Sequence, residues 1–354
     1  MRDKKILIVY TNFSTFVKKD YEDLNKHYIV RRYRFKSYKG IFKNLIQFIK
    51  QFFFLCFFGW RFQVFLIWFA DYHSVLPILF SKLFHKRSLL IIGGYDATGI
   101  KEINYGIFYS NKLRKIINKY SIKLAKYILP VDKSLINGEN SYAKSNEIIP
   151  VGIKNIVNEL KGEIIELPTG YDSNNWKRNT KIKRNSDVMC VAGITNKNTW
   201  ILKGGDLLLN IAKITSEIDF HFYGVNDSMK YYLDSKNIPI NFHIHGYVDN
   251  KELPDIYSKH KVYAQFSLSE GLPNVLCEAM LCECVPVGSN VNGIPNVIGN
   301  KNFILVKKDT IQAKNLLLKA IESDDQLGKH FRTRIVRKFS QEKRHNTLLK
   351  IIND

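Results

Sequence analysis

The sequence predicts an α/β protein with two doubly wound parallel-sheet domains. Its 354 residues suffice for about two domains that each bury a core. Short β-rich runs alternate with helical patterns on both sides of one polar, basic stretch, and this alternation is typical of parallel sheets wound by right-handed crossovers. Hydrophobic residues make up 45% of the chain and charged residues 24%, which excludes disordered, collagenous and coiled-coil proteins.

The first half of the chain contains five predicted strands and three predicted helices. The strands are expected at residues 6–10, 28–33, 64–69, 88–92 and 127–130. The helices are expected at residues 40–58, 75–84 and 108–125. Strands that alternate with helices in this way favour βαβ units.

The apolar run from residue 52 to 70 is nearly long enough to span a membrane. Gly59, Arg61 and Gln63 interrupt it, and a charge near the middle of a span costs about 3 kcal/mol. We therefore expect two elements instead, a helix that ends near Phe58 and a buried strand that follows it.

The polar stretch 173–186 lacks apolar periodicity and is predicted to be a linker. It separates an N-terminal domain, 1–172, from a C-terminal domain, 187–325. In the second domain we expect strands at 187–192, 218–223, 241–244, 261–265, 285–288 and 303–305, and a helix at 204–214. Helices are expected from 310 to 352, with Asp309 as a helix cap, and those of 326–354 are predicted to cross back to the N-terminal domain.

The charge of the chain points to an anionic partner. There are 54 Lys+Arg against 32 Asp+Glu, a net charge of +22, which suits nucleic acid, a membrane surface or phosphorylated substrates. No base-reading module is present, so nucleic acid is not expected. Five cysteines without a Cys-x-x-Cys pair, and an N-terminal apolar run too short for a signal peptide, favour a reducing, cytoplasmic location.

The stretch 267–299 is the most informative part of the sequence. Glu270 and Gly271 lie in a predicted turn after a strand, Pro273 suits the first helical position, and Glu278 lies about two turns inside the helix. The N-terminus of such a helix offers free N–H groups to phosphate or sugar oxygens. The unit recurs in shortened form at Gly293-Ile294-Pro295, so two helix N-termini are expected to face one ligand.

This segment closely resembles the nucleotide-sugar-binding signature of family-four glycosyltransferases, retaining enzymes with the GT-B fold of two Rossmann-like domains that face a central cleft. The resemblance implies that Glu270 meets the hydroxyls of the donor sugar, as a catalytic residue, and that Glu278 binds the ribose. It also implies that the backbone around Gly271, Leu272, Pro273 and Asn274 faces the sugar and the diphosphate.

Other segments resemble the same family. The run 190–206 resembles the first strand and loop of the C-terminal domain, in which a lysine meets the diphosphate. Residues 245–248 resemble the turn that covers the base. The substrate-binding residues implied by these two segments are Gly193, Thr195, Lys197, Lys203, Gly204, Gly246, Tyr247 and Val248. Ile194 and Thr195 stand where the family often has an arginine, so this partner is either missing or replaced by Lys197.

The N-terminal half departs from the family after the strand at 88–92. The family commonly has a histidine there, whereas this chain has Gly93-Gly94-Tyr95-Asp96. Tyr95 or Asp96 takes the place of the histidine as a catalytic residue, or His73 does so from the preceding strand. The alternative is a tight turn that the aspartate caps.

The helix at 40–58 is the best membrane candidate. It carries an aromatic face and follows the basic run RRYRFKSYK, a combination that suits an anionic membrane surface. The alternative is that this face packs on the sheet.

No metal and no cofactor are expected. No Asp-x-Asp pair is present to hold a metal beside a diphosphate, and the family is metal-independent. His243 and His245 would share a face of a strand, but the sequence offers no third ligand beside them.

The expected function is a metal-independent hexosyltransferase in polysaccharide biosynthesis, such as that of lipopolysaccharide or capsule. It would move a sugar, with retention, from a UDP- or GDP-sugar to a hydroxyl of a lipid-linked or cell-surface polysaccharide acceptor. It would work in the cytoplasm as a peripheral protein on the inner face of the cell membrane. The alternatives are a non-catalytic nucleotide-sugar-binding protein and a GT-B epimerase.

Overall fold

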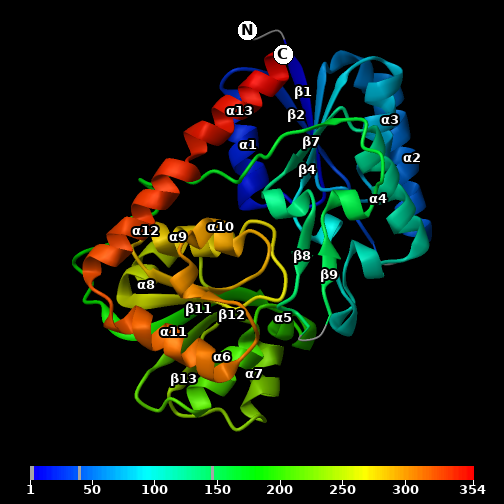
Figure 1. Cartoon of the computed structure of the whole chain (residues 1–354). Helices are drawn as coiled ribbons and strands as arrows, with labels where there is room; N and C mark the ends of the chain where they lie inside the picture. Colours follow the sequence, from blue (N-terminus) through cyan, green and yellow to red (C-terminus); the bar gives the residue numbers. More distant parts are fainter. Residues whose placement is uncertain (1–3, 39–40, 145–146) are drawn as a thin grey trace. The chain divides into compact units, whose positions relative to one another are not determined.

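The computed structural model describes residues 4–38, 41–144 and 147–354, and the chain forms two compact α/β units (Figure 1). Unit 1 comprises Met1–Glu139, Pro150–Gly170 and Glu342–Asp354, and unit 2 comprises Asn140–Ile149 and Tyr171–Gln341. The predicted α/β class and the two parallel sheets are confirmed.

Unit 1 is built on a six-stranded sheet in the order β10-β7-β4-β3-β1-β2. Its strands are β1 (Lys5–Tyr10), β2 (Ile29–Arg34), β3 (Val64–Trp68), β4 (Arg87–Ile92), β7 (Tyr127–Pro130) and β10 (Glu163–Ile164). All neighbouring strands are parallel. The central strands are runs of buried apolar residues, because helices cover both faces of a parallel sheet.

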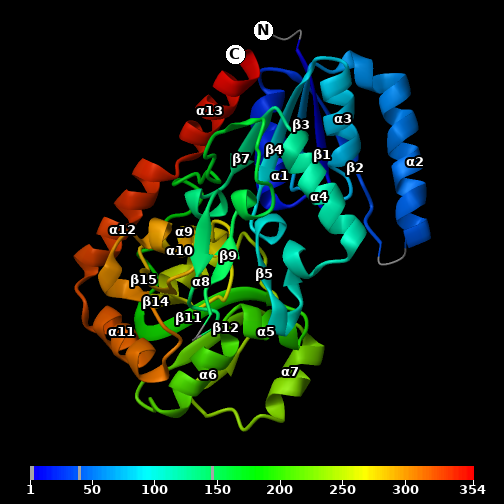
Figure 2. The ribbon, with the colours of Figure 1, turned by 45° about the vertical axis from the view of Figure 1, so that its right-hand side comes forward.

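The helices of unit 1 form a layer on each side of this sheet (Figure 2). They are α1 (Thr15–Asn25), α2 (Ile41–Phe58), α3 (Val75–Leu83), α4 (Lys112–Leu124) and α13 (Gln341–Asn353). Helices α1 and α13 lie on one side, and α2, α3 and α4 on the other. A short antiparallel ladder joins β5 (Gly99–Ile100) to β6 (Tyr105–Gly106). The strands β8 (Gly138–Asn140) and β9 (Ile149–Val151) are three residues each.

The segment 52–70 folds as two elements, as predicted. Helix α2 ends at Phe58, a 3₁₀ turn covers Gly59–Arg61, and β3 is buried throughout. Within the described ranges we find no helix with the length and apolar character that crossing a membrane requires.

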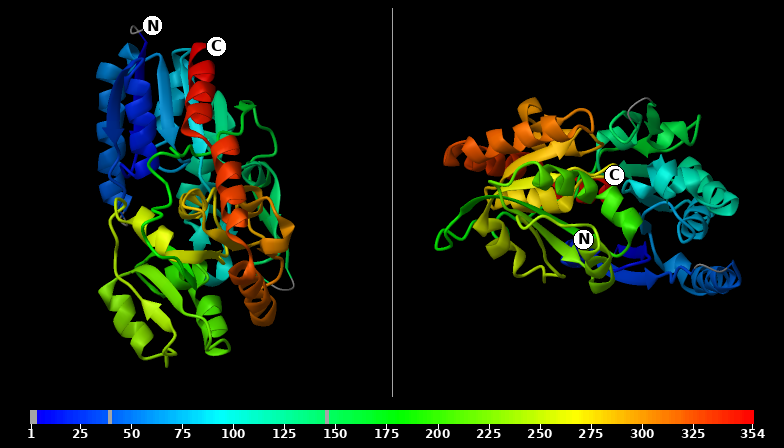
Figure 3. Two further views of the ribbon diagram at one scale, coloured as in Figure 1. Left: turned by 90° about the vertical axis from the view of Figure 1, so that its left-hand side faces the viewer. Right: turned by 90° about the horizontal axis from the view of Figure 1, so that it is seen from below.

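Helix α13 is tied to unit 1 by a buried ion pair. Both nitrogens of the Arg344 fork donate to the carboxylate of Asp20 on α1, each at 2.7 Å. The last residues of α13 lie beside the start of β1 (Figure 3), where Lys4 Nζ donates to the carbonyl of Ile352 at 3.0 Å. The preceding helix, α12, belongs to unit 2.

Unit 2 is built on a second parallel sheet of six strands, in the order β13-β12-β11-β14-β15-β16. The strands are β11 (Asn185–Ile194), β12 (Phe220–Val225), β13 (Phe242–Ile244), β14 (His260–Gln265), β15 (Val285–Ser289) and β16 (Ile304–Leu305). The helices are α5 (Lys197–Leu202), α6 (Gly205–Lys213), α7 (Asp227–Asp234), α8 (Leu253–Lys259), α9 (Asn274–Leu281), α10 (Ile294–Ile298), α11 (Thr310–Glu322) and α12 (Asp325–Lys338).

The polar stretch 173–186 packs as part of unit 2. Trp176 is buried, and the guanidinium of Arg332 on α12 donates to its carbonyl at 2.7 Å. Arg184 donates to the carbonyls of Cys282 and Glu283. The side chains of this stretch therefore anchor it, although its backbone carries no helix.

Candidate functional site

The carboxyl end of β14 carries a partly exposed ion pair between Lys203 and Glu270. Glu270 Oε1 accepts hydrogen bonds from Lys203 Nζ at 2.6 Å, Ser267 Oγ at 2.8 Å and Gln265 Nε2 at 3.1 Å. The Lys203 side chain keeps 27% of its surface exposed and that of Glu270 keeps 12%. Lys203 and Glu270, which lie far apart in the sequence, thus form an ion pair, and the two neutral donors hold the carboxylate of Glu270 in place.

Lys203 reaches this position through a turn that only glycine can make. The helix predicted at 204–214 is α6, and the structure adds α5 before it, with Lys203 as the C-cap of α5. Gly204 follows with φ +75°, and a Cβ there would lie 2.2 Å from the carbonyl oxygen of Phe266. The chain therefore passes close against the end of β14, which brings Lys203 beside Glu270.

The turns before α9 and α10 are hydrogen-bonded to each other. The amide of Gly293 donates to the carbonyl of Gly271 at 3.1 Å, and the amide of Glu270 donates to Asn292 Oδ1 at 3.2 Å. The two helix N-termini therefore lie side by side, and that they face one ligand stays a prediction. Pro273 differs from the prediction, because it is the N-cap of α9 with extended backbone rather than the first helical residue.

Three backbone amides around the start of α9 have no acceptor within the described part of the chain. Among the described residues, the amides of Gly271, Leu272 and Asn274 donate no hydrogen bond. The Asn274 side chain is engaged, since its Oδ1 accepts from Tyr171 Oη at 2.6 Å. Glu278 is the fifth residue of α9, just over one turn from its start, and is only 6% exposed. Free N–H groups at a helix N-terminus beside a lysine make a donor set for phosphate oxygens.

Of the substrate-binding residues expected around the end of β11, Gly193 and Thr195 lie at that strand end, whereas Lys197 lies at the start of α5. Gly193 leaves open space, since a Cβ there meets nothing within 4 Å, and the amide of Thr195 donates to Thr199 Oγ1 at 3.1 Å. Lys197 opens α5 and lines a different cavity, together with Lys213 and neither Lys203 nor Glu270. Lys197 thus lines a cavity apart from the Lys203–Glu270 pair, and its expected role as the replacement of the family's arginine stays a prediction.

The predicted base turn follows β13. The carbonyl of Gly246 accepts from the amide of Gly224 at 2.9 Å, which holds the turn against the end of β12. Tyr247 is 83% exposed. Gly246, Tyr247 and Val248 thus form a solvent-facing loop at the carboxyl edge of the sheet.

His243 and His245 belong to a histidine cluster on one face of the second sheet. His245 Nε2 lies 3.0 Å from His221 Nδ1, and His260 lies 2.8 Å from Asp187 and 3.0 Å from Tyr223 Oη. Burial lowers the pKa of His221 to about 4, so the ring is neutral at pH 7.

The ligand atoms of Asp187, His221 and His260 lie within 4.8 Å of one another, the one group of metal-ligating side chains found within the described ranges. The predicted pair His243 and His245 is not part of that group. Within the group, His260 already hydrogen-bonds both Asp187 and Tyr223. The geometry is therefore that of a satisfied polar network.

Asp96 in unit 1 caps its own turn. It is buried, and its carboxylate accepts from the amides of Gly93, Gly94 and Ala70 at 2.9–3.0 Å. Burial raises the pKa of Asp96 to about 6, although these backbone donors act in the opposite direction. The structure thus adopts the alternative that the sequence left open, a tight turn capped by the aspartate.

The two other candidates in unit 1 differ in exposure. Tyr95 is half-buried, and its hydroxyl accepts from Arg114 Nη1 at 2.9 Å. His73 is buried with one ring nitrogen 2.7 Å from the carbonyl of Trp68, and burial lowers its pKa. Of the three candidates considered to replace the histidine of the family, only Tyr95 is partly exposed.

The sequence did not reveal the residues that support the ion pair. Gln265, Ser267 and Asn292 contact Glu270, and Tyr171 fixes Asn274. Gln265, which directly follows the apolar residues 262–264 of β14, was the one available signal, because a buried amide needs a partner.

Comparison with known proteins places this geometry in a family. The family model described as "Glycosyl transferases group 1" matches residues 172–351, which is just over half of the chain. The phosphatidylinositol N-acetylglucosaminyltransferase GPI3 subunit of Saccharomyces cerevisiae is 28% identical over 184 residues, which cover 47% of this chain and 40% of the yeast protein. The O-antigen chain mannosyltransferase B of Escherichia coli is 29% identical over 79 residues, 22% of this chain and 21% of that protein. The chain thus spans well under half of the length of these curated relatives.

Solved structures resemble the whole chain. The sucrose-phosphate synthase of Thermosynechococcus elongatus has a TM-score of 0.75 at 14% identity, covering 99% of this chain and 98% of its own. HepE of Anabaena, solved with UDP and glucose, has a TM-score of 0.70 at 11% identity, covering 99% of this chain and 100% of its own. At such identities the likeness shows the fold, which is that of GT-B proteins with two Rossmann-like domains. The chain therefore belongs to the glycosyl transferases group 1 family.

Proposed function

We propose that this protein is a glycosyltransferase that moves a hexose, with retention, from a nucleotide diphosphate sugar to a hydroxyl of a lipid-linked or cell-surface polysaccharide acceptor. The observation that supports a nucleotide diphosphate sugar as donor is the Lys203–Glu270 pair. Beside it lie the amides of Gly271, Leu272 and Asn274, which donate no hydrogen bond to the described residues. A cation and converging N–H donors suit a diphosphate, and a carboxylate suits sugar hydroxyls. Relatives that act in O-antigen and glycolipid synthesis support the acceptor class.

The proposed chemistry depends on balancing the charge of the leaving diphosphate. Lys203 Nζ turns from Glu270 to the diphosphate when the donor binds, and the freed carboxylate of Glu270 accepts from sugar hydroxyls. Glu278 holds the ribose, and the loop 246–248 covers the base. The acceptor hydroxyl attacks the anomeric carbon from the face that the diphosphate leaves, and a leaving phosphate oxygen takes the hydroxyl proton. Lys203 and the amides stabilise the charge that grows in this step.

We further propose that the protein needs neither a metal nor a cofactor. It works in the cytoplasm as a peripheral protein on the inner membrane face and has no nucleic-acid partner. Metal independence follows from Lys203 and the N-terminus of α9, because together they supply the positive charge that a divalent cation would otherwise bring. Unit 1, with Tyr95 at the carboxyl edge of its sheet, holds the acceptor.

The test is donor turnover with a panel of UDP- and GDP-sugars, measured as release of free nucleotide diphosphate with and without membrane extract. Acceptor-dependent release from one donor, an α-linked product from an α-linked donor by NMR, and full turnover in EDTA are expected. Binding of a nucleotide sugar without any turnover would favour a non-catalytic binding protein. A change in the sugar without transfer would favour an epimerase, and a strict need for Mn²⁺ or Mg²⁺ would contradict the charge balance proposed for Lys203.

A further inference from the structure

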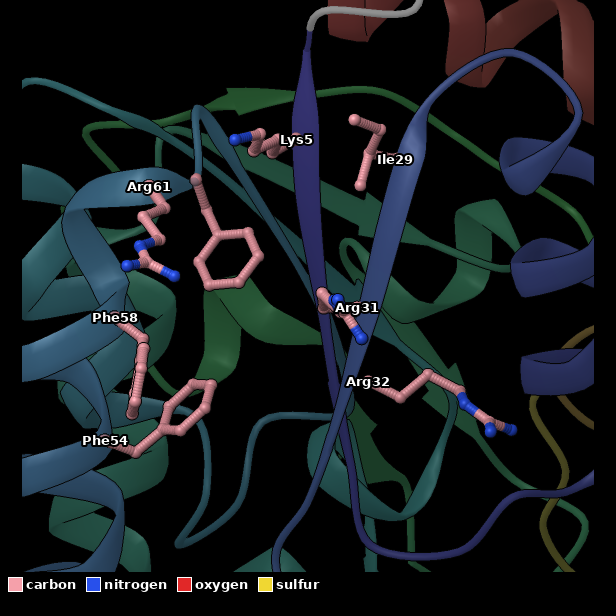
Figure 4. A pocket seen from close by; sticks show the side chains of 8 residues that line it. Lys5, Ile29, Arg31, Arg32, Phe54, Phe58 and Arg61 are labelled. Carbon is pink, nitrogen blue, oxygen red and sulfur yellow. The ribbon is translucent and has the colours of Figure 1, made fainter.

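A cavity opens at the amino edge of the first sheet, between strand β2 and the C-terminal half of α2 (Figure 4). Its volume is about 520 Å³, within the range of small-molecule sites. Lys5, Arg31 and Arg61 supply positive charge, and Phe54, Phe58 and Phe62 supply an apolar wall. It lies at the opposite edge of the sheet from the Gly93–Asp96 turn, which follows the carboxyl end of β4.

The charge in this cavity is not neutralised by the protein. No carboxylate of the described residues forms an ion pair with Lys5, Arg31 or Arg61, and none lines the cavity. The guanidinium of Arg61 lies over the rings of Phe58 and Trp60, at 5.6 Å and 5.2 Å from their centroids. Such stacking positions a cation and leaves its N–H groups available to an anion.

Arg32 provides an internal contrast. It borders the same cavity, but neighbouring residues of a strand point to opposite faces, and its guanidinium stacks on Phe13 and Tyr21 at 4.7 Å and 4.6 Å. In Figure 4 the Arg32 side chain extends away from Phe54 and Phe58. Arg31, on the other face, belongs to the side of β2 on which Tyr33 packs against Phe54.

An exposed apolar surface begins beside the cavity. The exposed side chains at the adjoining ends of α2 and α3 are Phe53, Phe57, Phe58, Trp60, Leu83 and Phe84. They lie on adjacent elements, since Lys86 Nζ donates to the carbonyl of Trp60 at 2.9 Å. Monomeric proteins rarely expose aromatic clusters of this kind in water, and aromatic rings beside Arg and Lys are typical of side chains at a lipid headgroup boundary.

We propose that this cavity binds the phosphate of an anionic membrane phospholipid. Lys5, Arg31 and Arg61 hold the phosphate oxygens, and the acyl chains run along the aromatic surface of α2 and α3. The proposal rests on the membrane location given under the proposed function and adds the site, the lipid chemistry and the residues. Charge complementarity favours a headgroup with a net negative charge over a zwitterionic one, and the aromatic wall favours a lipid over a soluble phosphate.

The test is flotation of the full chain with vesicles of phosphatidylcholine alone or mixed with phosphatidylglycerol. We expect binding only when phosphatidylglycerol is present. Arg31→Gln and Arg61→Gln should each weaken binding about fivefold, the effect of one basic residue near an anionic surface. Arg32→Gln removes the same charge from the neighbouring position and should change binding much less, and Lys50→Gln on α2 serves as a second charge control.

Each outcome decides between the cavity and an alternative. Equal losses in Arg31→Gln, Arg32→Gln and Lys50→Gln would mean diffuse attraction and overturn the cavity. Release by soluble glycerol phosphate at concentrations comparable to the lipid would mean a small-phosphate site instead. Slow donor hydrolysis in solution, measured for the same variants, should be unchanged. Absence of donor hydrolysis in the wild-type protein would instead count against the proposed transferase function, whatever the vesicle result.

Discussion

The two sheets end in similar turns that use their acidic residue in opposite ways. In unit 2 the turn after β14 runs from Ser267 to Glu270, and in unit 1 the turn after β4 runs from Gly93 to Asp96, each with the acid three residues on. Glu270 is held outward by a lysine and keeps part of its surface exposed. Asp96 turns inward, onto the amides of its own turn, and is buried.

The side chains explain the difference. Aspartate is short enough to hydrogen-bond the amides of its own turn, and two glycines bring those amides close. Glutamate reaches further and meets Lys203, which the Gly204 turn delivers from another strand–helix connection. The acid after β14 is thus held by a lysine and two neutral side chains, as the proposed donor site requires, whereas the acid after β4 caps backbone amides.

The largest effect is expected for Lys203→Ala, which removes the functional half of the comparison. If Lys203 stabilises charge on the leaving diphosphate, turnover should fall by roughly 10²–10³-fold, the typical loss for one charge-stabilising donor. Steady-state kinetics with the identified donor measure it. Lys197→Ala is the matched control, since Lys197 lines another cavity, and its turnover should stay close to that of the wild type. Equal losses in both variants would contradict the distinction between these lysines.

Asp96→Ala tests the structural half. It leaves two buried amides and one partly buried amide without their acceptor, and each buried one costs about 1–3 kcal/mol, so the free energy of unfolding should fall by about 3 kcal/mol. Urea unfolding measures this change. Asp96→Asn keeps an acceptor oxygen and should recover most of the stability. A stable Asp96→Ala protein that has lost turnover would instead assign Asp96 a catalytic role.

The strands could be predicted from the sequence, whereas the contacts at their ends could not. Runs such as those of β1, β3 and β4 are apolar enough to identify buried parallel strands. Helix α5 was missed because it has six residues and no apolar periodicity, although Asn196 and Thr199 form a capping box at its start.

The same limit explains the site. Glu270 and Lys203 carry charge and stand beside glycines, so their residue types alone suggested a role. The groups that set their geometry, Gln265 and Ser267, are ordinary polar residues whose importance depends on a tertiary contact. Asn292 adopts φ +45° to reach the amide of Glu270, a conformation that no local pattern requires.

Glu278→Gln should have a smaller effect, confined to binding of the donor. If Glu278 binds the ribose equally in the ground and transition states, its replacement raises the donor KM about tenfold and leaves kcat nearly unchanged. Glutamine keeps the size and one acceptor oxygen, so a thermal melt should show a folded protein. A loss confined to kcat would mean that Glu278 acts in the chemical step, and unchanged kinetics would place the ribose elsewhere.

The smallest net effect is expected from pH, because the two units respond in opposite directions. His221 has a folded pKa of about 4, lowered first by burial and then by His260, while an unfolded histidine titrates near 6.5. As the pH falls from 6.5 to 4, the unfolded state binds more protons, and unit 2 loses stability. Asp187 opposes this loss, whereas His243 and His245 add to it.

Asp96 has the reverse sign. Its folded pKa is about 6, raised by burial from an ordinary value of 3.8, so the folded state binds the proton first between pH 6 and 4 and unit 1 gains stability. Hydrogen exchange at pH 6.5 and pH 4.5, corrected for the intrinsic rate, separates the two contributions. Protection should fall in β12 and rise in β4, while the unfolding free energy of the whole chain changes little. Parallel changes in both strands would show that titration elsewhere dominates, and the contrast between the two turns would then not extend to stability.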